Sequence, residues 1–265
     1  MDGLSDDQVQ QAADLLMALR RKELVLEDLP DDLTPQTTAD IQRIIDATNL
    51  QIDRPVRGWK LYTVYKPMNP PFYAPIYDVF ESGAVIPMSL SELRLIEPEI
   101  IFRADRDLPP RAHHYAIDEI RDAVTAHVGF EIIGSRFRQS DLGSAYALSK
   151  GQKSHYGSLS DNIANGCVVV GDAIPNWRDI AFEDVSLRLT ENDHEIIHFV
   201  GGHPFDNPFL PVIVGVNRMR RGAGIRAGEV IITSSSTSFF PVSAGTVIRA
   251  TYEGLGEVSA SFADI

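Results

Sequence analysis

Two glutamates that share one face of an expected strand are the first candidates for chemistry. Glu97 and Glu99 stand two positions apart in the apolar segment 95–102, which has the composition of a β-strand. Side chains at positions i and i+2 of a strand point to the same face, so both carboxylates should project together. Two like charges at that distance repel each other. They therefore require solvent, a proton, a basic side chain or a cation.

Glu131 is an acid in an equally unexpected place. It lies in an apolar, strand-like run bounded by Gly129 and Gly134. An acid in such a run is either paired inside the protein or functional. Three carboxylates supply the oxygen ligands that suit Mg²⁺ or Mn²⁺, whereas zinc would draw histidine or cysteine. The spacing alone still leaves open a solvated pair at Glu97 and Glu99.

The elements that must position these acids begin with two expected helices. Ser5 and Gln8 form a capping-box pattern before the first helix. The second is expected to begin at Thr34-Pro35, with proline at the first helical position. A further amphipathic helix is predicted by the apolar positions 117, 120, 124 and 128, and another at 208–220.

The rest of the chain has the composition of β-structure. The segment 58–65 favours a strand, and the proline-rich segment 67–75 cannot be a helix or a central strand. From Gly166 onward, short β-like runs alternate with Gly and Pro turns. The pattern predicts a mostly antiparallel β domain with a few helices, and thus an α+β protein.

Composition excludes several function classes. The 265 residues carry a net charge of −13 and no block of basic residues, so nucleic acid is a poor partner. The single cysteine, Cys167, rules out an internal disulfide. No apolar stretch approaches the roughly 20 residues that span a bilayer, and the first residues are unlike a targeting signal. We therefore expect a cytoplasmic protein without a membrane partner.

Several short motifs occur in the order typical of one enzyme family. The segments 58–61, 76–79, 96–100, 131–136, 227–233 and 254–258 read GWKL, IYDV, IEPEI, EIIGSR, AGEVIIT and GLGEV. In this order they resemble the 2-keto-4-pentenoate hydratase group of the fumarylacetoacetate hydrolase superfamily. The resemblance runs from about Leu16 to Phe262, nearly the whole chain.

The resemblance implies a fold and an assembly. The expected fold is a mixed-β roll or barrel with a small helical N-terminal portion. We place an N-terminal α/β portion at 1–85 and the catalytic β domain at 86–265. Members of the group are typically homo-oligomers, and a complex with another enzyme of the pathway is a further expectation.

The resemblance also implies roles for individual residues. Glu97, Glu99 and Glu131 would bind Mg²⁺ or Mn²⁺. Lys60 is the candidate for proton transfer or for pairing the substrate carboxylate, and Asp78 would orient Lys60 or a water. The candidate substrate-binding residues are Tyr62, Asp161, Asn162, Ser235 and Thr237.

The chain departs from the family pattern near the expected pocket. Tyr62 and Tyr65 replace small or polar residues, and Ser234 replaces a glycine. Losing that glycine removes a backbone freedom that would let a main-chain amide approach the substrate closely. These changes bear on the substrate and the reaction, while the three glutamates are unaffected.

The activity implied is that of a metal-dependent hydro-lyase in the catabolism of aromatic compounds. It would add water to a 2-hydroxy-2,4-dienoate to give a 4-hydroxy-2-oxo acid, so the expected partner is a small 2-oxo acid. Decarboxylation of a 2-oxo diacid of the 4-oxalocrotonate type is an alternative. Hydrolytic C–C cleavage of an acylpyruvate is another, and a non-catalytic homologue that acts as a scaffold is the fourth.

Overall fold

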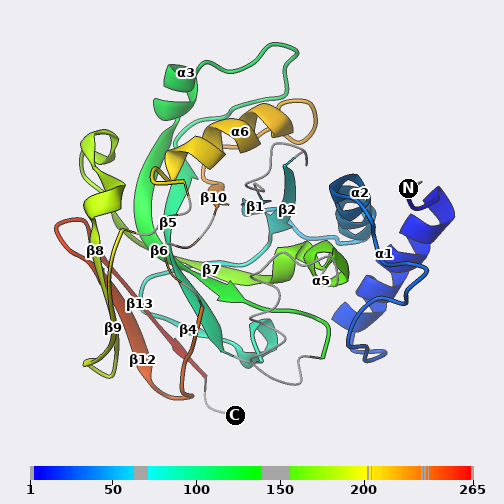
Figure 1. The fold of residues 1–265 in the computed structure, drawn as a ribbon, viewed down its shortest axis with the longest axis horizontal. Helices are drawn as coiled ribbons and strands as arrows, with labels where there is room; N and C mark the ends of the chain where they lie inside the picture. The colour runs from blue at the N-terminus through cyan, green and yellow to red at the C-terminus, as the bar shows by residue number, and fades with distance from the viewer. Residues whose placement is uncertain are drawn as a thin grey trace.

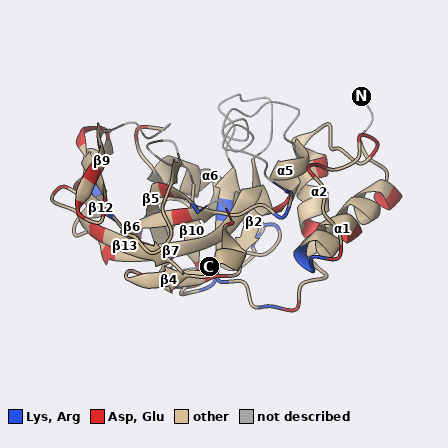
Figure 2. Cartoon of the chain, turned by 90° about the horizontal axis from the view of Figure 1, so that it is seen from below, with Lys and Arg blue, Asp and Glu red and all other residues tan. Residues whose placement is uncertain are grey.

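Two β-sheets with helices at their margins make up the chain in the computed structural model (Figure 1). The structure describes residues 3–62, 71–92, 94–138, 156–201, 203, 205–233, 235, 237 and 239–263. Among these residues, no helix combines the length and apolar character needed to cross a membrane. Acidic positions are spread over helices and strands alike (Figure 2).

The two N-terminal helices stand at one side of the molecule, beside β2 and α5 (Figure 1). Helix α1, Asp6–Arg20, begins with the expected capping box between Ser5 and Gln8. Helix α2, Thr38–Asn49, begins later than predicted. The side chain of Thr37 accepts a hydrogen bond from Asp40 N and caps the helix there, so the prediction of a start at Thr34-Pro35 was wrong.

The larger sheet has the strand order β2-β1-β10-β5-β6-β7-β3, and β11 pairs with β5. The proline-rich segment ends in β2, an edge strand, where Pro75 needs no ladder donor. Among the described pairs in this sheet, β1 with β10 and β3 with β7 run parallel and the others antiparallel. The strands are β1 Gly58–Tyr62, β2 Phe72–Ile76, β3 Val79–Glu81, β5 Leu95–Ala104, β6 Val124–Ile133, β7 Asn165–Ala173, β10 Val230–Ile232 and β11 Phe240–Pro241.

One predicted helix is mostly a strand. Helix α3 covers only Ile117–Arg121, and β6 begins at Val124. From Val124 to Val128 the burial alternates, as expected for one side of a strand packed into the core. Gly129 lies in β6 where an added Cβ would stand 2.0 Å from Ile101 Cδ1. The ten-residue pairing with β5 therefore prevails over the helical spacing of the apolar positions.

The smaller sheet lies on the side opposite the N-terminal helices (Figure 1). Its strand order is β4-β13-β12-β8-β9. Its strands are β4 Ala84–Ile86, β8 Ser186–Glu191, β9 His194–Val200, β12 Val247–Tyr252 and β13 Gly256–Phe262. The remaining helices among the described residues are α5 Tyr156–Ser160 and α6 Phe209–Met219, with short 3₁₀ turns at Met88–Leu90, Asn162–Ala164, Trp177–Asp179 and Phe182–Asp184.

The main hydrophobic core is formed between the two sheets. Buried residues of both sheets, such as Phe102, Phe130 and Phe262, belong to one cluster. Two mixed sheets with few helices confirm the predicted α+β class. Strand pairs such as β1 with β10 and β4 with β13 join segments on either side of residue 86, and the domain boundary there stays a prediction.

Candidate metal centre

The carboxylates of Glu97, Glu99 and Glu131 meet at the centre of the larger sheet. Glu97 and Glu99 lie two positions apart on β5, and the register places Glu131 of β6 directly opposite Glu97. One carboxylate oxygen from each residue can be chosen so that all lie within 4.8 Å of one another. Glu99 and Glu131 are buried and Glu97 is half-buried. The arrangement concentrates negative charge in a site with little solvent.

Burial and mutual repulsion make the charged form of these acids costly. Burial, followed by repulsion from Glu131, raises the pKa of Glu97 to about 7, although Lys60 opposes the shift. Burial, followed by repulsion from Glu131 and Glu97, raises the pKa of Glu99 well above its usual value. Both oxygens of Glu99 and Oε2 of Glu131 have no hydrogen-bond partner among the described residues. Such buried, unpartnered carboxylate oxygens fit the ligand set of a hard divalent cation.

Lys60 reaches this cluster from β1. Its Nζ lies 2.6 Å from Glu131 Oε1 and donates to the carbonyl of Ile163 at 3.0 Å. Burial alone would lower the pKa of Lys60, but attraction from Glu131 and Glu97 outweighs it and raises that pKa. The amino group is therefore charged, and it stands beside the carboxylates, while its predicted role in proton transfer or in pairing the substrate carboxylate stays a prediction.

A left-handed turn supplies the carbonyl that holds Lys60. Asn162, Ile163 and Ala164 have φ values of 51°, 54° and 53°. This region costs L-residues about 1–2 kcal/mol each, and the β-branched Ile163 is especially unsuited to it. The turn is held by Ala164 N, which donates to the carbonyl of Asp161 at 3.0 Å. Strain at this point therefore serves to direct a backbone acceptor at the Lys60 ammonium.

Asn165 follows this turn and was not singled out from the sequence. Its side-chain Nδ2 donates to Glu131 Oε1 at 2.9 Å, the oxygen that also binds Lys60. Asn165 begins β7, next to β6, and is buried. A lone asparagine after a predicted turn carries no signal that would have revealed this contact.

Three of the predicted substrate-binding residues lie next to the carboxylate cluster. Tyr62 lies two positions beyond Lys60 on β1 and stacks on Phe72, with ring centroids 4.8 Å apart. Ser235 forms an isolated β-bridge with Glu99, and its Oγ accepts from Thr237 N at 3.1 Å. Tyr65 and Ser234, where the chain departs from the family, lie outside the described residues.

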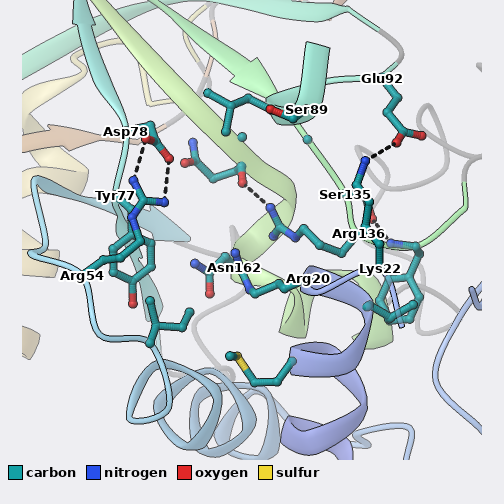
Figure 3. Close-up of a pocket in the computed structure, with 18 of the residues that line it drawn as sticks. Arg20, Lys22, Arg54, Tyr77, Asp78, Ser89, Glu92, Ser135, Arg136 and Asn162 are labelled. Atoms are coloured by element: carbon teal, nitrogen blue, oxygen red, sulfur yellow. Dashed lines mark hydrogen bonds and ion pairs between the residues drawn. The ribbon is translucent and has the colours of Figure 1, made fainter. Parts of the chain in front are cut away.

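Asp78 is engaged by a different partner from the one expected. Its carboxylate accepts two hydrogen bonds from Arg54, at 2.7 and 3.2 Å (Figure 3). The structure shows no contact between this carboxylate and Lys60 among the described residues. The proposed orienting role of Asp78 therefore has no direct geometric support.

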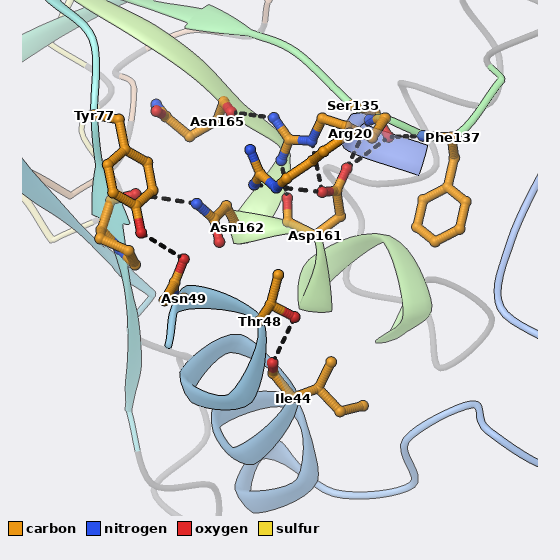
Figure 4. Close-up of polar contacts among 12 residues, drawn as sticks. Arg20, Ile44, Thr48, Asn49, Tyr77, Ser135, Phe137, Asp161, Asn162 and Asn165 are labelled. Atoms are coloured by element: carbon orange, nitrogen blue, oxygen red, sulfur yellow. Dashed lines mark hydrogen bonds and ion pairs between the residues drawn. The ribbon is translucent and has the colours of Figure 1, made fainter. Parts of the chain in front are cut away.

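Asp161 directly precedes the left-handed turn, and Asn162 is its first residue (Figure 4). Asp161 is fully buried, and its Oδ1 accepts from Arg136 Nε at 2.6 Å, while Oδ2 accepts from the Arg136 backbone N–H at 2.7 Å. The Nδ2 of Asn162 donates to the carbonyl of Pro75 at 3.2 Å. These contacts hold the backbone of the turn, and they favour a positioning role over direct substrate contact.

Tyr252 is a second residue that the sequence did not single out. It ends β12 of the smaller sheet, is buried, and has no hydrogen-bond partner for its hydroxyl among the described residues. Burial, followed by the charge of Glu99, raises its pKa well above the usual value. Its position beside Glu99 results from packing between the sheets, which no local sequence pattern reports.

No family model matches the chain. It is 26% identical over 197 residues to the 2-keto-4-pentenoate hydratase of Paraburkholderia phymatum, which covers 73% of this chain and 71% of that protein. It is 28% identical over 198 residues to a 4-oxalocrotonate decarboxylase from a Pseudomonas species, covering 72% of this chain and 69% of the relative.

Solved structures show the same architecture. The 4-oxalocrotonate decarboxylase of Pseudomonas putida G7, complexed with calcium and acetate, superposes with a TM-score of 0.73 at 22% identity over 98% of both chains. A protein from Yersinia pestis assigned to the fumarylacetoacetate hydrolase family has a TM-score of 0.52 at 14% identity, over 80% of this chain and 94% of that one.

The fold is of the fumarylacetoacetate hydrolase type. In sequence, the chain is similar to the 2-keto-4-pentenoate hydratases, at 26% identity. The family resemblance of the sequence motifs is thereby confirmed.

Proposed function

We propose that this protein is a Mg²⁺- or Mn²⁺-dependent hydro-lyase that adds water to a 2-hydroxy-2,4-dienoate in the catabolism of aromatic compounds. The observation that carries the proposal is the carboxylate cluster with one lysine beside it. Three glutamates meet within 4.8 Å, and the Lys60 Nζ lies 2.6 Å from one of them. The curated relatives named hydratase support the reaction type.

Glu97, Glu99 and Glu131 would hold the cation. The unpartnered atoms of Glu99 and Glu131 are carboxylate oxygens. Hard cations such as Mg²⁺ and Mn²⁺ prefer oxygen ligands to softer nitrogen or sulfur ligands. When bound, a divalent cation supplies the positive centre that attracts the carboxylate and 2-oxygen of the substrate. The solved decarboxylase structures that resemble this fold contain calcium or magnesium, which supports a divalent ion of this kind.

Lys60 would transfer the proton that the reaction requires. Because the carboxylates keep its amino group charged, Lys60 holds a proton at Nζ inside a half-buried site. The Ile163 carbonyl and Glu131 orient that amino group. Tyr62 lies on the same strand face as Lys60, and we assign it to the wall of the substrate site together with Ser235 and Thr237.

A decarboxylase of the 4-oxalocrotonate type is the second candidate. It is favoured by the solved structures of such an enzyme, which match 98% of this chain, and by a decarboxylase relative at 28% identity. Both reactions begin from a 2-oxo acid held at one cation, and they differ in whether water adds or CO₂ leaves. The cluster geometry is therefore compatible with either.

One assay separates the two reactions. The purified protein with Mg²⁺ is given freshly generated 2-hydroxypenta-2,4-dienoate and, separately, 4-oxalocrotonate and an acylpyruvate. Ultraviolet absorbance reports loss of the dienoate, and released CO₂ reports decarboxylation. Hydration without CO₂ supports the proposal, and CO₂ release from 4-oxalocrotonate supports the second candidate. Cleavage of the acylpyruvate would point to C–C hydrolysis.

Matched variants test the metal site itself. Glu99→Gln removes a buried ligand, whereas Glu81→Gln alters an exposed glutamate on the outer strand β3, whose side chain is 71% exposed. We expect EDTA or Glu99→Gln to abolish turnover and Glu81→Gln to leave it unchanged. Turnover that survives both EDTA and Glu99→Gln would refute the metal mechanism, and no turnover on any of the acids would favour the scaffold interpretation.

A further inference from the structure

A second pocket lies between the N-terminal helices and the larger sheet (Figure 3). Its volume is about 630 Å³, within the range of small-molecule sites. Its walls include the end of α1 at Arg20, the loop at Arg54, the strand end at Pro75 and the segment after β6 at Arg136. None of Glu97, Glu99, Glu131 and Lys60 is among its described lining residues.

Basic side chains gather around this pocket, although the whole chain carries a net charge of −13. The acids of the lining are fewer than the bases. The basic lining residues are Arg20, Lys22, Arg54, Arg136 and Arg138, and the acidic ones are Asp53, Asp78 and Glu92. A cavity lined in this way attracts anions locally against the field of the protein as a whole.

Two of these arginines already have close carboxylate partners. Arg54 makes two hydrogen bonds to Asp78, at 2.7 and 3.2 Å. Arg136 donates from Nε to Asp161 at 2.6 Å, and from its Nη atoms to the carbonyls of Asn165 and Asp161. The charge of Arg136 is therefore largely balanced by the protein itself, whereas Arg54, whose side chain is 51% exposed, can still face a second anion.

Arg20 has no carboxylate this close among the described residues. Its Nη2 lies 3.8 Å from Asp161 Oδ1, beyond hydrogen-bond reach, and Arg136 holds that carboxylate more closely (Figure 4). Its Nε and Nη2 are buried without a hydrogen-bond partner in the described part of the chain, while its side chain as a whole is 21% exposed. Burial, and then repulsion from Arg136, lower its pKa to about 10. Buried guanidinium donors without partners are costly unless an anion reaches them.

We propose that this pocket binds a small oxyanion, a carboxylate or a phosphate, with Arg20 as the principal ligand and Arg54 as a second cationic group. The planar guanidinium fork matches both anions, because each offers two oxygens in one plane to parallel N–H groups. The site is separate from the proposed metal centre, and the segment from Asp161 to Asn165 forms the wall between them.

The test must keep organic acids out of the metal centre. Isothermal titration calorimetry is therefore done on the full chain treated with EDTA, with inorganic phosphate and with succinate as separate probes. Sodium chloride at matched ionic strength and neutral succinamide are the controls. We expect saturable binding of one phosphate or one succinate per chain, and the tighter of the two defines the class of anion.

The variants locate the binding. Arg20→Gln should weaken it at least tenfold, while Arg188→Gln, which alters an arginine on β8 whose side chain is 58% exposed, should leave it unchanged. Heats no larger than those of chloride, or equal affinity in Arg20→Gln, would overturn the proposal. If circular dichroism shows that Arg20→Gln is unfolded, Arg54→Gln decides in its place: weakening of threefold or more supports the site, and no change overturns it.

Discussion

At the scale of single residues, the central feature is a set of acids whose charges the fold does not balance completely. One positive amino group, on Lys60, faces Glu97, Glu99 and Glu131. Raised pKa values and unpartnered oxygens are the expected consequence. Such a site would lower the stability of the metal-free protein.

Glu99→Gln should therefore stabilise the protein when metal is absent. The substitution removes a buried acid that must either stay charged or take up a proton at a raised pKa. The gain should be about 1–3 kcal/mol at pH 7. Urea unfolding in EDTA measures it, with Glu81→Gln as the exposed control. A variant less stable than the parent in EDTA would show that Glu99 is satisfied in some other way.

Lys60→Met should separate catalysis from metal binding. Removing the ammonium removes the proposed proton donor, and we expect kcat to fall about 10²–10⁴-fold. Metal affinity should hold or increase, because a positive charge next to Glu131 disappears. Titration with Mn²⁺ and steady-state kinetics on the same preparation report the two effects. A parallel loss of both would indicate that Lys60 builds the site instead.

The pKa of Glu97 sets a pH dependence for metal binding. A carboxyl with a pKa of about 7 in the metal-free protein must lose its proton before it binds a cation. Affinity should rise with pH by about tenfold per pH unit for each proton that the ligands release, and because the pKa of Glu99 is also raised, the rise should continue until both acids are ionised. The stability of the metal-free protein should change in the opposite direction. The folded state holds the proton more tightly than the unfolded chain, so stability falls between about pH 4.5 and 7. Calorimetric titrations of Mn²⁺ from pH 5.5 to 8 measure the affinity, and a flat profile would contradict the shift.

At the scale of elements, the segment between α5 and β7 joins the two sites. Its left-handed turn presents the Ile163 carbonyl to Lys60, and its far end, Asn165, contacts Glu131. Arg136 holds the same segment from the other side through Asp161. A strained turn is retained where surrounding contacts outweigh its cost.

Arg136→Gln should release this segment. It leaves the fully buried Asp161 without its closest cation, and the expected loss is about 3–5 kcal/mol of unfolding free energy. Combining it with Asp161→Asn should restore part of that loss, because the unpaired charge is removed. Denaturant unfolding of the two single variants and the double variant measures the coupling. Simple additivity of the two losses would show that the pair does not act as a unit.

At the scale of the whole molecule, a cation held by β5 and β6 should stabilise the central sheet. Binding to the folded state alone raises the free energy of unfolding by about 2.7 kcal/mol at a metal concentration one hundred times the Kd. We expect Mg²⁺ or Mn²⁺ to raise the melting temperature and Glu99→Gln to abolish the increase. An equal increase in both proteins would locate the metal elsewhere.

The assembly of the protein, as a homo-oligomer or in a complex with a pathway enzyme, stays a prediction. Light scattering coupled to size-exclusion chromatography tests the first against the chain mass of 29.3 kDa. A mass near that value would contradict it.

The sequence by itself determined the local part of the site. The two-residue period of a strand places Glu97 and Glu99 on one face, and the structure agrees. The apolar run around Glu131 marked that acid as unusual, and it is buried. Ordered motifs indicated the resemblance to the hydratase group that the curated relatives support, because their order along the chain does not depend on knowing the fold.

Only the tertiary structure decided how distant segments meet. The β5–β6 register places Glu131 opposite Glu97, and the packing of β1 and the left-handed turn brings Lys60 to Glu131. The same long-range pairing made a strand of residues whose spacing suggested a helix after Ile117. It also paired Asp78 with Arg54 and left Arg20 without a close carboxylate among the residues that the structure describes. These contacts join residues far apart in the chain, and their energies depend on burial and register that no local pattern carries.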